Sequence, residues 1–84
     1  MPQSERSENM KEILRWLDAK TTKDGGATRD EYIHHTVLEI TGYGGSERTA
    51  LSYLKTLVKH GSVKEKGYKF MITKAGKDWL QRHG

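Results

Sequence analysis

The sequence predicts one small α+β domain, and two patterns carry that prediction. Up to Gly61, apolar residues recur at the spacing of amphipathic helices in three successive stretches. Beyond Gly61, they alternate with polar residues as they do in β-strands. A chain of 84 residues has room for a single core. We therefore expect one domain over residues 8–82, preceded by a disordered polar arm over residues 1–7.

The composition argues against several classes of protein. There is no cysteine, which removes disulfides, thiolate metal sites and cysteine nucleophiles and favours a cytoplasmic location. No apolar run approaches the roughly 18 residues of a membrane span, and the N-terminus lacks the apolar core of a signal peptide. The formal net charge is +4, and residues 46–84 alone hold 9 Lys/Arg against 3 Asp/Glu. This half of the chain suits a polyanionic partner, although a solvated lysine-rich surface has the same composition.

The first helix is expected from Ser7, which can cap it, to about Lys20. Trp16 lies off the centre of its apolar stripe, so the indole either closes one edge of the core or meets a partner. The stripe that we expect to be buried consists of Met10, Ile13, Leu14 and Leu17.

Residues 21–27 read as a loop, because Asp24, Gly25 and Gly26 form a turn-prone cluster. Two adjacent glycines can cradle a phosphate, but no lysine–serine pair follows as in a P-loop. Alternatively, Gly26 and Ala27 add a strand of one or two residues to a nearby sheet.

The second helix is expected over residues 29–41, because Thr28 and Glu31 have the spacing of a capping box. His34 and His35 are neighbours that point about 100° apart, so they cannot chelate one metal ion together, and we expect no metal site. Ile33, Val37 and Ile40 are expected to be buried, with Tyr32 and Leu38 beside them.

The third helix is the most basic and amphipathic stretch, from its cap at Ser46 to its stop at Gly61. The preceding residues 42–45 are short and glycine-rich, as in a helix-turn-helix connection or an ordinary helical corner. The apolar side holds Ala50, Leu54, Leu57 and Val58, and the opposite side holds Arg48, Ser52, Lys55, Thr56 and Lys59. Such a helix fits a DNA major groove, and it equally fits a solvated surface.

Two alternating runs, residues 62–66 and 68–72, are hinged on Gly67 and predict a β-hairpin. Tyr68, Phe70 and Ile72 should face the helices, with Lys69 and Met71 opposite. Three lysines, Lys64, Lys66 and Lys69, lie near its tip, where they can contact a polyanion or prevent edge-to-edge pairing.

A final helix is expected to run from its cap at Thr73 to about Arg82. Gly76 should weaken it by about 1 kcal/mol relative to alanine. Trp79 either covers the apolar face of the hairpin or takes part in a dimer contact.

This order of elements is that of a winged helix-turn-helix domain: a three-helix core, a hairpin wing and a short C-terminal helix. The chain resembles the small MarR-, PadR- and ArsR-like winged-helix transcription regulators of bacteria, archaea or their viruses from about Met10 to Leu80. The likeness is most specific in residues 49–63, which resemble the family's recognition helix and the start of its wing. Residues 68–76 add an aromatic pattern followed by Thr-x-x-Gly.

The resemblance implies that base contacts come from Arg48, Thr49, Ser52, Tyr53 and Lys55. It also implies wing contacts to phosphate or the minor groove from Lys64, Lys66 and Lys69. We expect further contacts to the DNA backbone from Ser46, Thr56 and Lys59. A helical wheel agrees on Arg48, Ser52 and Lys55 and is compatible with Thr49. It places Tyr53 at the edge, half-packed beside Leu57. Two departures from the family are a wing with room for only about two tip residues and Ala50 where a valine is common.

The predicted function is sequence-specific binding of double-stranded DNA as a transcription regulator, with no cofactor. Because one recognition helix spans few base pairs, we expect a homodimer on an inverted repeat. The candidate dimer residues are Trp16, Trp79 and Leu80. The alternative is a winged-helix protein-interaction module that docks on an acidic partner. We do not expect an enzyme, because the sequence has no serine–histidine–acid pattern or carboxylate pair and little volume for a substrate pocket.

Overall fold

The computed structural model describes residues 2–41 and 47–83. Its elements are α1 (Pro2–Asp24), β1 (Ala27–Thr28), α2 (Arg29–His35), a short π-helix η1 (Thr36–Ile40), α3 (Glu47–Lys59), β2 (Val63–Lys66), β3 (Lys69–Ile72) and α4 (Lys74–His83). The strands form one antiparallel sheet in the order β1-β3-β2. The predicted α+β class is confirmed.

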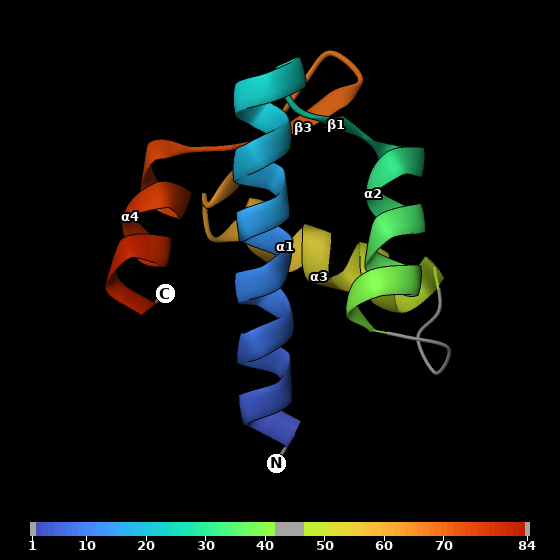
Figure 1. Ribbon diagram of the computed structural model, residues 1–84, viewed down its shortest axis with the longest axis vertical. Coiled ribbons are helices and arrows are strands. Elements are labelled where there is room, and N and C mark those ends of the chain that lie inside the picture. Colours follow the sequence, from blue (N-terminus) through green and yellow to red (C-terminus); the bar gives the residue numbers. More distant parts are fainter. Residues whose placement is uncertain (1, 42–46, 84) are drawn as a thin grey trace.

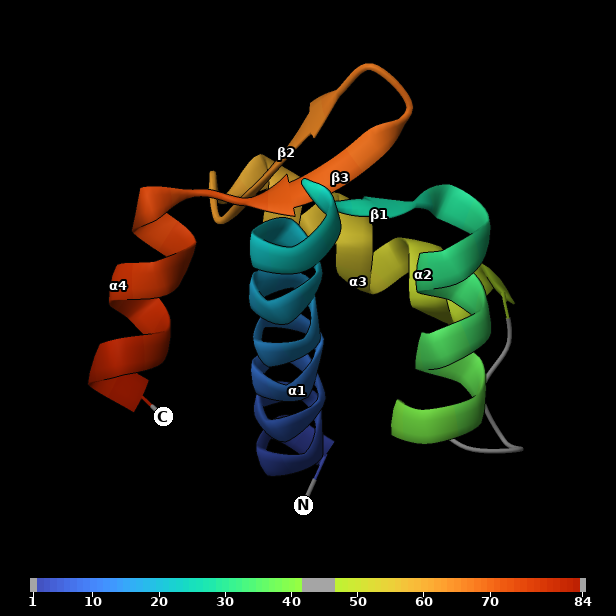
Figure 2. The same ribbon diagram turned by 45° about the horizontal axis from the view of Figure 1, so that its top comes forward.

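Helix α1 runs through the middle of the molecule (Figure 1). Helix α4 lies on one side of it and α2 on the other, while α3 passes behind. The sheet covers the end of α1 at which that helix stops, and the hairpin of β2 and β3 extends beyond the helices (Figure 2). The core between these elements is built from Ile13, Leu14, Leu17, Ala27, Tyr32, Ala50, Tyr53, Leu54, Leu57, Val63 and Ile72.

Helix α1 is longer at both ends than the sequence predicts. It begins at Pro2, so the expected disordered arm is wrong for residues 2–7, and Ser7 lies within the helix instead of capping it. Once a helix is nucleated by its buried stripe, each added turn costs little, and proline is tolerated in a first turn. At the other end, residues 21–24 are helical, and the amides of Gly25 and Gly26 close the helix on the carbonyls of Thr21 and Lys20. The short strand considered for residues 26–27 is present as β1, at Ala27–Thr28.

Helix α2 begins at the predicted capping box. The Glu31 amide donates to the Thr28 hydroxyl at 3.2 Å, and the Thr28 amide donates to the Glu31 carboxylate at 3.0 Å. The buried residues differ from the prediction: Tyr32 and Thr36 are fully buried. Ile33, Val37 and Ile40 are only partly buried against the core, and Leu38 is 50% exposed. The face of the helix that packs on the core is therefore rotated by about one residue, or roughly 100°, from the predicted face.

Helix α3 matches the predicted amphipathic pattern with two exceptions. Ala50, Leu54 and Leu57 are buried as expected, whereas Val58 is 40% exposed and Tyr53 is buried. The helix ends in a Schellman motif, in which the Ser62 amide donates to the Leu57 carbonyl and the Gly61 amide to the Val58 carbonyl. Gly61 has the positive φ of 80° that this ending needs, so the predicted stop is confirmed.

The hairpin has the predicted two-residue tip, Gly67 and Tyr68, since Lys66 pairs with Lys69. Gly67 has φ 65°, and no other residue type has a positive φ in the described part of the chain, which fits a type II′ turn. Ile72 is buried and Phe70 half-buried, as expected. The prediction that Tyr68 faces the helices is wrong: it sits in the turn, beyond the helices, and is 75% exposed.

Helix α4 begins at the predicted cap, where the Gly76 amide donates to the Thr73 hydroxyl at 3.1 Å. Gly76 is buried, and a Cβ atom at this position would collide with the backbone carbonyl oxygen of Ser62 and with Cγ1 of Ile72. Glycine lowers the stability of the helix relative to alanine, but it lets α4 pack closely on the segment that joins α3 to β2.

Candidate nucleic-acid interface

The outer side of α3 presents a narrow arc of polar and cationic residues. At about 100° per residue, positions 48, 52, 55 and 59 fall within roughly 60° of one another around the helix. All four are exposed, while the opposite side of the helix is buried in the core. We call this set the α3 arc, and its members are Arg48, Ser52, Lys55 and Lys59.

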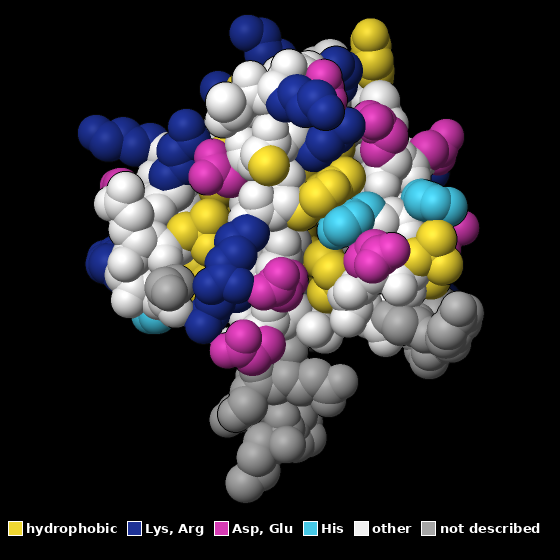
Figure 3. Space-filling view, viewed as in Figure 1, with side chains coloured by type: hydrophobic (Ala, Val, Ile, Leu, Met, Phe, Trp, Pro, Cys, Tyr) yellow, Lys and Arg dark blue, Asp and Glu magenta, His cyan; other side chains and the backbone are white. Residues whose placement is uncertain are grey.

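The cations of the α3 arc differ from those of α1 in their partners. On α1, Lys11 pairs with Glu8 at 3.2 Å, and Arg15 pairs with Glu12 at 2.6 Å. Figure 3 shows the two signs of charge interspersed on the face that includes α1. Among the side chains of residues 7–41 and 47–83, no carboxylate lies within 4.0 Å of the cationic groups of the α3 arc. The arc therefore has positive charge available for an external anion.

The ammonium group of Lys20 is paired with carboxylates of the same chain. Its ammonium contacts the carboxylates of Asp24 and Glu31, each at 3.0 Å. Hydrogen bonds to Asp24 and then to Glu31 raise the pKa of Lys20. In turn, the hydrogen bond from the Thr28 backbone, followed by that from Lys20, lowers the pKa of Glu31 to about 2. These contacts tie the end of α1 to the start of α2.

The two threonines among the predicted contacts lie together on one side of the α3 arc. Thr49 is exposed, and Thr56 is half-buried. The Thr56 hydroxyl donates to the backbone carbonyl of Ser52 at 3.0 Å, within the same helix. Both threonines make interactions inside the protein, so a nucleic acid would have to share or replace them.

Tyr53 was predicted to contact bases, and the structure places it elsewhere. Its side chain is only 7% exposed and belongs to the core. The Asn9 side-chain amide donates to its hydroxyl at 3.2 Å, which links α3 to α1. Position 53 is about 100° from position 52, so the chain can expose Ser52 only by turning Tyr53 toward α1.

The register of the hairpin places its three lysines on one face. Lys66 lies opposite Lys69, and Lys64 lies opposite Met71, so these side chains share a side of the pleat. The other side holds Val63 and Ile72, which are buried.

The three lysines are not equivalent, however. Lys64 and Lys66 are exposed. Lys69 is half-buried, and its ammonium donates to the backbone carbonyl of Asp24 at 2.8 Å. Lys69 therefore anchors the hairpin to the end of α1, and Lys64 and Lys66 are the wing cations best placed for an external phosphate.

The position of α3 relative to α2 is fixed by a buried tyrosine. The Tyr32 hydroxyl donates to the backbone carbonyl of Ala50, and the ring has no solvent exposure. Burial raises the pKa of Tyr32 well above its usual range, so it stays a neutral donor. Among the described residues, this hydrogen bond and the ion pair of Arg29 with Glu47 at 3.8 Å link α2 to α3. Ser46 and residues 42–45 of the predicted glycine turn lie outside the described residues.

The three candidate dimer residues pack within the chain. The Trp16 ring stacks on His35 with a centroid distance of 4.4 Å. Trp79 contacts the His83 ring at 4.5 Å. Trp79 and Leu80 are both half-buried against the core. Each therefore has an intramolecular role, whatever the oligomeric state.

No group of three or more His, Asp or Glu side chains in residues 7–41 and 47–83 is arranged to hold a metal ion. None of the helices in this part of the chain has the length and apolar character needed to cross a membrane. No family model, curated protein or solved structure matches this chain. The function must therefore be argued from the surface itself.

Proposed function

We propose that this chain is a winged-helix DNA-binding protein that acts in transcription regulation. The observation that carries the proposal is the α3 arc, an exposed cationic stripe on a rigid helix with no acidic partner among the described residues. Helix α3 would lie in the major groove, and the exposed lysines of the hairpin would contact the phosphate backbone. The resemblance of residues 49–63 to a recognition helix and the start of its wing favours the same reading.

Within the α3 arc, the side chains suit different contacts. Arg48 has the planar donor geometry that binds guanine through two hydrogen bonds. Ser52 can bond to a base edge or to a phosphate, and Lys55 lies beside both on the helix surface. Lys59, in the last turn, is suited to a phosphate. Each phosphate neutralised by a lysine releases condensed counterions, so affinity should fall steeply with salt.

The test is a titration of fluorescent duplex DNA of mixed sequence at about 50 and about 200 mM salt. Lys59→Ala should weaken binding to all sequences and reduce the slope of log affinity against log salt by about 0.9. Lys11→Ala is the matched control, because it removes a lysine that is paired with Glu8 on α1. After selection of a preferred sequence, Arg48→Ala should lose discrimination at one base pair by about 1–3 kcal/mol.

Absence of salt-dependent duplex binding would contradict the proposal, as would equal effects of Lys59→Ala and Lys11→Ala. The protein-interaction module is the competing function, since the same cations would attract an acidic protein surface. NMR separates the two: duplex DNA should shift the amide signals of residues 47–59, and under the alternative it should leave them in place.

The proposal includes a homodimer, because one helix reads too few base pairs for a specific site. Two exposed apolar side chains, Leu38 and Val58, are available to such a contact alongside the edges of Trp16 and Leu80. Sedimentation equilibrium across a range of concentrations tests this part independently of DNA, and a mass of one chain throughout would remove it.

A further inference from the structure

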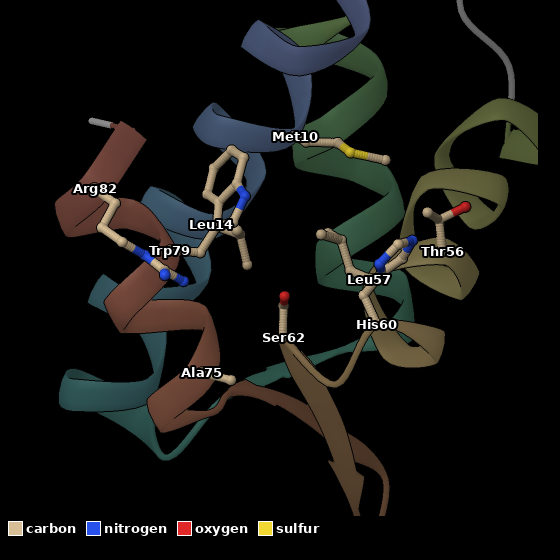
Figure 4. A pocket seen from close by; sticks show the side chains of 9 residues that line it. All are labelled: Met10, Leu14, Thr56, Leu57, His60, Ser62, Ala75, Trp79 and Arg82. Atoms are coloured by element: carbon tan, nitrogen blue, oxygen red, sulfur yellow. The ribbon is translucent and has the colours of Figure 1, made fainter.

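A cavity of about 270 Å³ lies where α1, α3 and α4 meet (Figure 4). This volume is just below the range of about 300–1,000 Å³ for sites that bind drug-sized ligands. No member of the α3 arc lines it. The lining residues are Met10, Leu14, Thr56, Leu57, His60, Ser62, Ala75, Trp79 and Arg82.

Most of the cavity wall is apolar. Trp79 from α4 stands on one side, Leu57 from α3 on the other, and Leu14 and Met10 from α1 lie behind and above (Figure 4). Aliphatic and thioether groups dominate this wall, so the space suits the hydrocarbon body of a ligand more than a charged or sugar-like one.

One hydroxyl points into this apolar space without a partner. Ser62 is only 9% exposed, and Figure 4 shows its side chain directed into the gap between Trp79 and Leu57. Its backbone groups are paired with Leu57 and Thr73, but its hydroxyl has no hydrogen-bond partner within the described residues. The hydroxyl is therefore available to donate a hydrogen bond to a ligand in the cavity.

The ionisable side chains that line the cavity are all basic. Arg82 from α4 supplies a guanidinium, and His60, at the end of α3, supplies an imidazole. None of the lining residues is acidic. A guanidinium and a hydroxyl together are suited to a carboxylate, which accepts hydrogen bonds from both.

We propose that this cavity binds a small aliphatic carboxylate, with the hydrocarbon chain against Leu14, Leu57 and Trp79 and the carboxylate toward Ser62 and Arg82. Hexanoate and octanoate have the size and polarity that the cavity selects. The inference goes beyond DNA binding, and it does not require DNA binding to be correct.

The test is an NMR titration of the full chain with octanoate below its micelle concentration. We expect saturable shifts of the Trp79 indole N–H and of the amides of residues 57–62 and 75–82. Arg82→Gln should weaken octanoate binding by about tenfold, as expected for the loss of one charge-assisted hydrogen-bonded pair. Lys74→Gln is the matched control: it makes the same charge change on the same helix, and Lys74 does not line the cavity.

A second variant keeps the test independent of charge. Ala75→Phe places a ring in the cavity and should abolish the shifts, while its thermal unfolding shows whether the fold is retained. 1-Octanol, which lacks the carboxylate, should bind at least tenfold more weakly than octanoate. Three outcomes would overturn the proposal: no saturable shift, equal binding of octanol and octanoate, or equal affinity of Arg82→Gln and Lys74→Gln. A dimer that buries the Trp79 indole would also overturn it, because a second copy would then fill the space.

The cavity is connected to the α3 arc through residues of α3. Thr56 and Leu57 line the cavity, and the Thr56 hydroxyl donates to the Ser52 carbonyl at 3.0 Å. If the proposed DNA binding holds, octanoate should change duplex affinity in the parent and not in Ala75→Phe. An unchanged affinity would reject this link alone, because the ligand titration is made without DNA.

Discussion

The imidazole of His35 lies flat on the indole of Trp16, with ring centroids 4.4 Å apart and an interplanar angle of 6°. The contact joins α2 to α1 and leaves both residues half-buried. Burial lowers the pKa of His35 below its usual 6.5; Glu39 opposes this shift with a smaller effect, and His34 adds slightly to it. The stacked pair thus favours a neutral imidazole.

The pH dependence follows from that direction. A histidine whose pKa is lower in the folded state takes up its proton more readily when unfolded, so stability rises with pH. The free energy of unfolding should be largest above about pH 6.5 and decline as the pH falls below that value. Urea titrations at several pH values measure it. His35→Phe, which keeps a ring against Trp16, should remove the decline, whereas His34→Gln should retain it. A decline that persists in His35→Phe would assign the effect to another group.

Glu31 is expected to cause a second decline in the free energy of unfolding, at more acidic pH; we call this decline the acid limb. Its folded pKa of about 2 lies below the ordinary 4.5, so its contribution is complete above pH 4.5 and is lost as the pH falls toward 2. Glu31→Gln should flatten this limb, and Thr28→Ala should cost about 1 kcal/mol through the lost cap. Asp30→Asn, a change to the neighbouring exposed acid, is the control. An acid limb of the same size in Glu31→Gln would contradict the prediction.

Gly76→Ala should destabilise the protein although alanine is the better helix former. The added methyl meets the Ser62 carbonyl and the Ile72 side chain, and we expect a net loss of about 1–3 kcal/mol in urea unfolding. Gln81→Ala, at an exposed position of the same helix, should change stability by no more than about 0.5 kcal/mol. If Gly76→Ala were the more stable protein, α4 could not pack as closely on the segment before β2 as it does here.

Tyr53→Phe should separate packing from DNA contact. Because the Tyr53 hydroxyl accepts a hydrogen bond from Asn9 at 3.2 Å, its removal should lower stability by about 1 kcal/mol. Duplex affinity should stay as in the parent, in contrast to Arg48→Ala. If Tyr53→Phe lost base discrimination while its stability was unchanged, Tyr53 would have to contact the DNA.

The two lysines that face each other on the hairpin should differ in their effect on DNA binding. Lys66→Gln should lower affinity and reduce the salt slope by about 0.9. Lys69→Gln should change the slope less and the stability more, because its ammonium is held on the Asp24 carbonyl at 2.8 Å. The measurements are the salt titration and urea unfolding of each variant. Equal slopes for the two variants would show that Lys69 releases Asp24 when DNA is present.

Features set by neighbouring residues could be predicted from the sequence. The capping box at Thr28 and Glu31, the stop at Gly61 and the two-residue hairpin tip each depend on a few adjacent positions. The exposed set on α3 follows from helical periodicity, which fixes which side chains share a face. For the same reason, Arg48, Ser52, Lys55 and Lys59 could be selected before any contact was known.

Several errors arose where the direction of a face depends on distant partners. Periodicity alone favours the aliphatic residues of α2 for the core, but Tyr32 is buried because its hydroxyl reaches the Ala50 carbonyl. Tyr53 is buried because α1 supplies Asn9. The cavity could not be foreseen, since Arg82, Ser62 and Leu14 are far apart in the chain and share no local pattern.

The sequence by itself determined the order of the main helices and strands, the starts of α2 and α4, the end of α3 and the charge on the outer side of α3, because caps, turns and periodicity act over a few residues. Only the tertiary structure decided that Lys69 is an anchor, that Gly76 is required by close packing, and that α1, α3 and α4 enclose a space with a hydroxyl turned into it. These depend on contacts between residues distant in sequence, where the position of one backbone sets the room and the partners available to another.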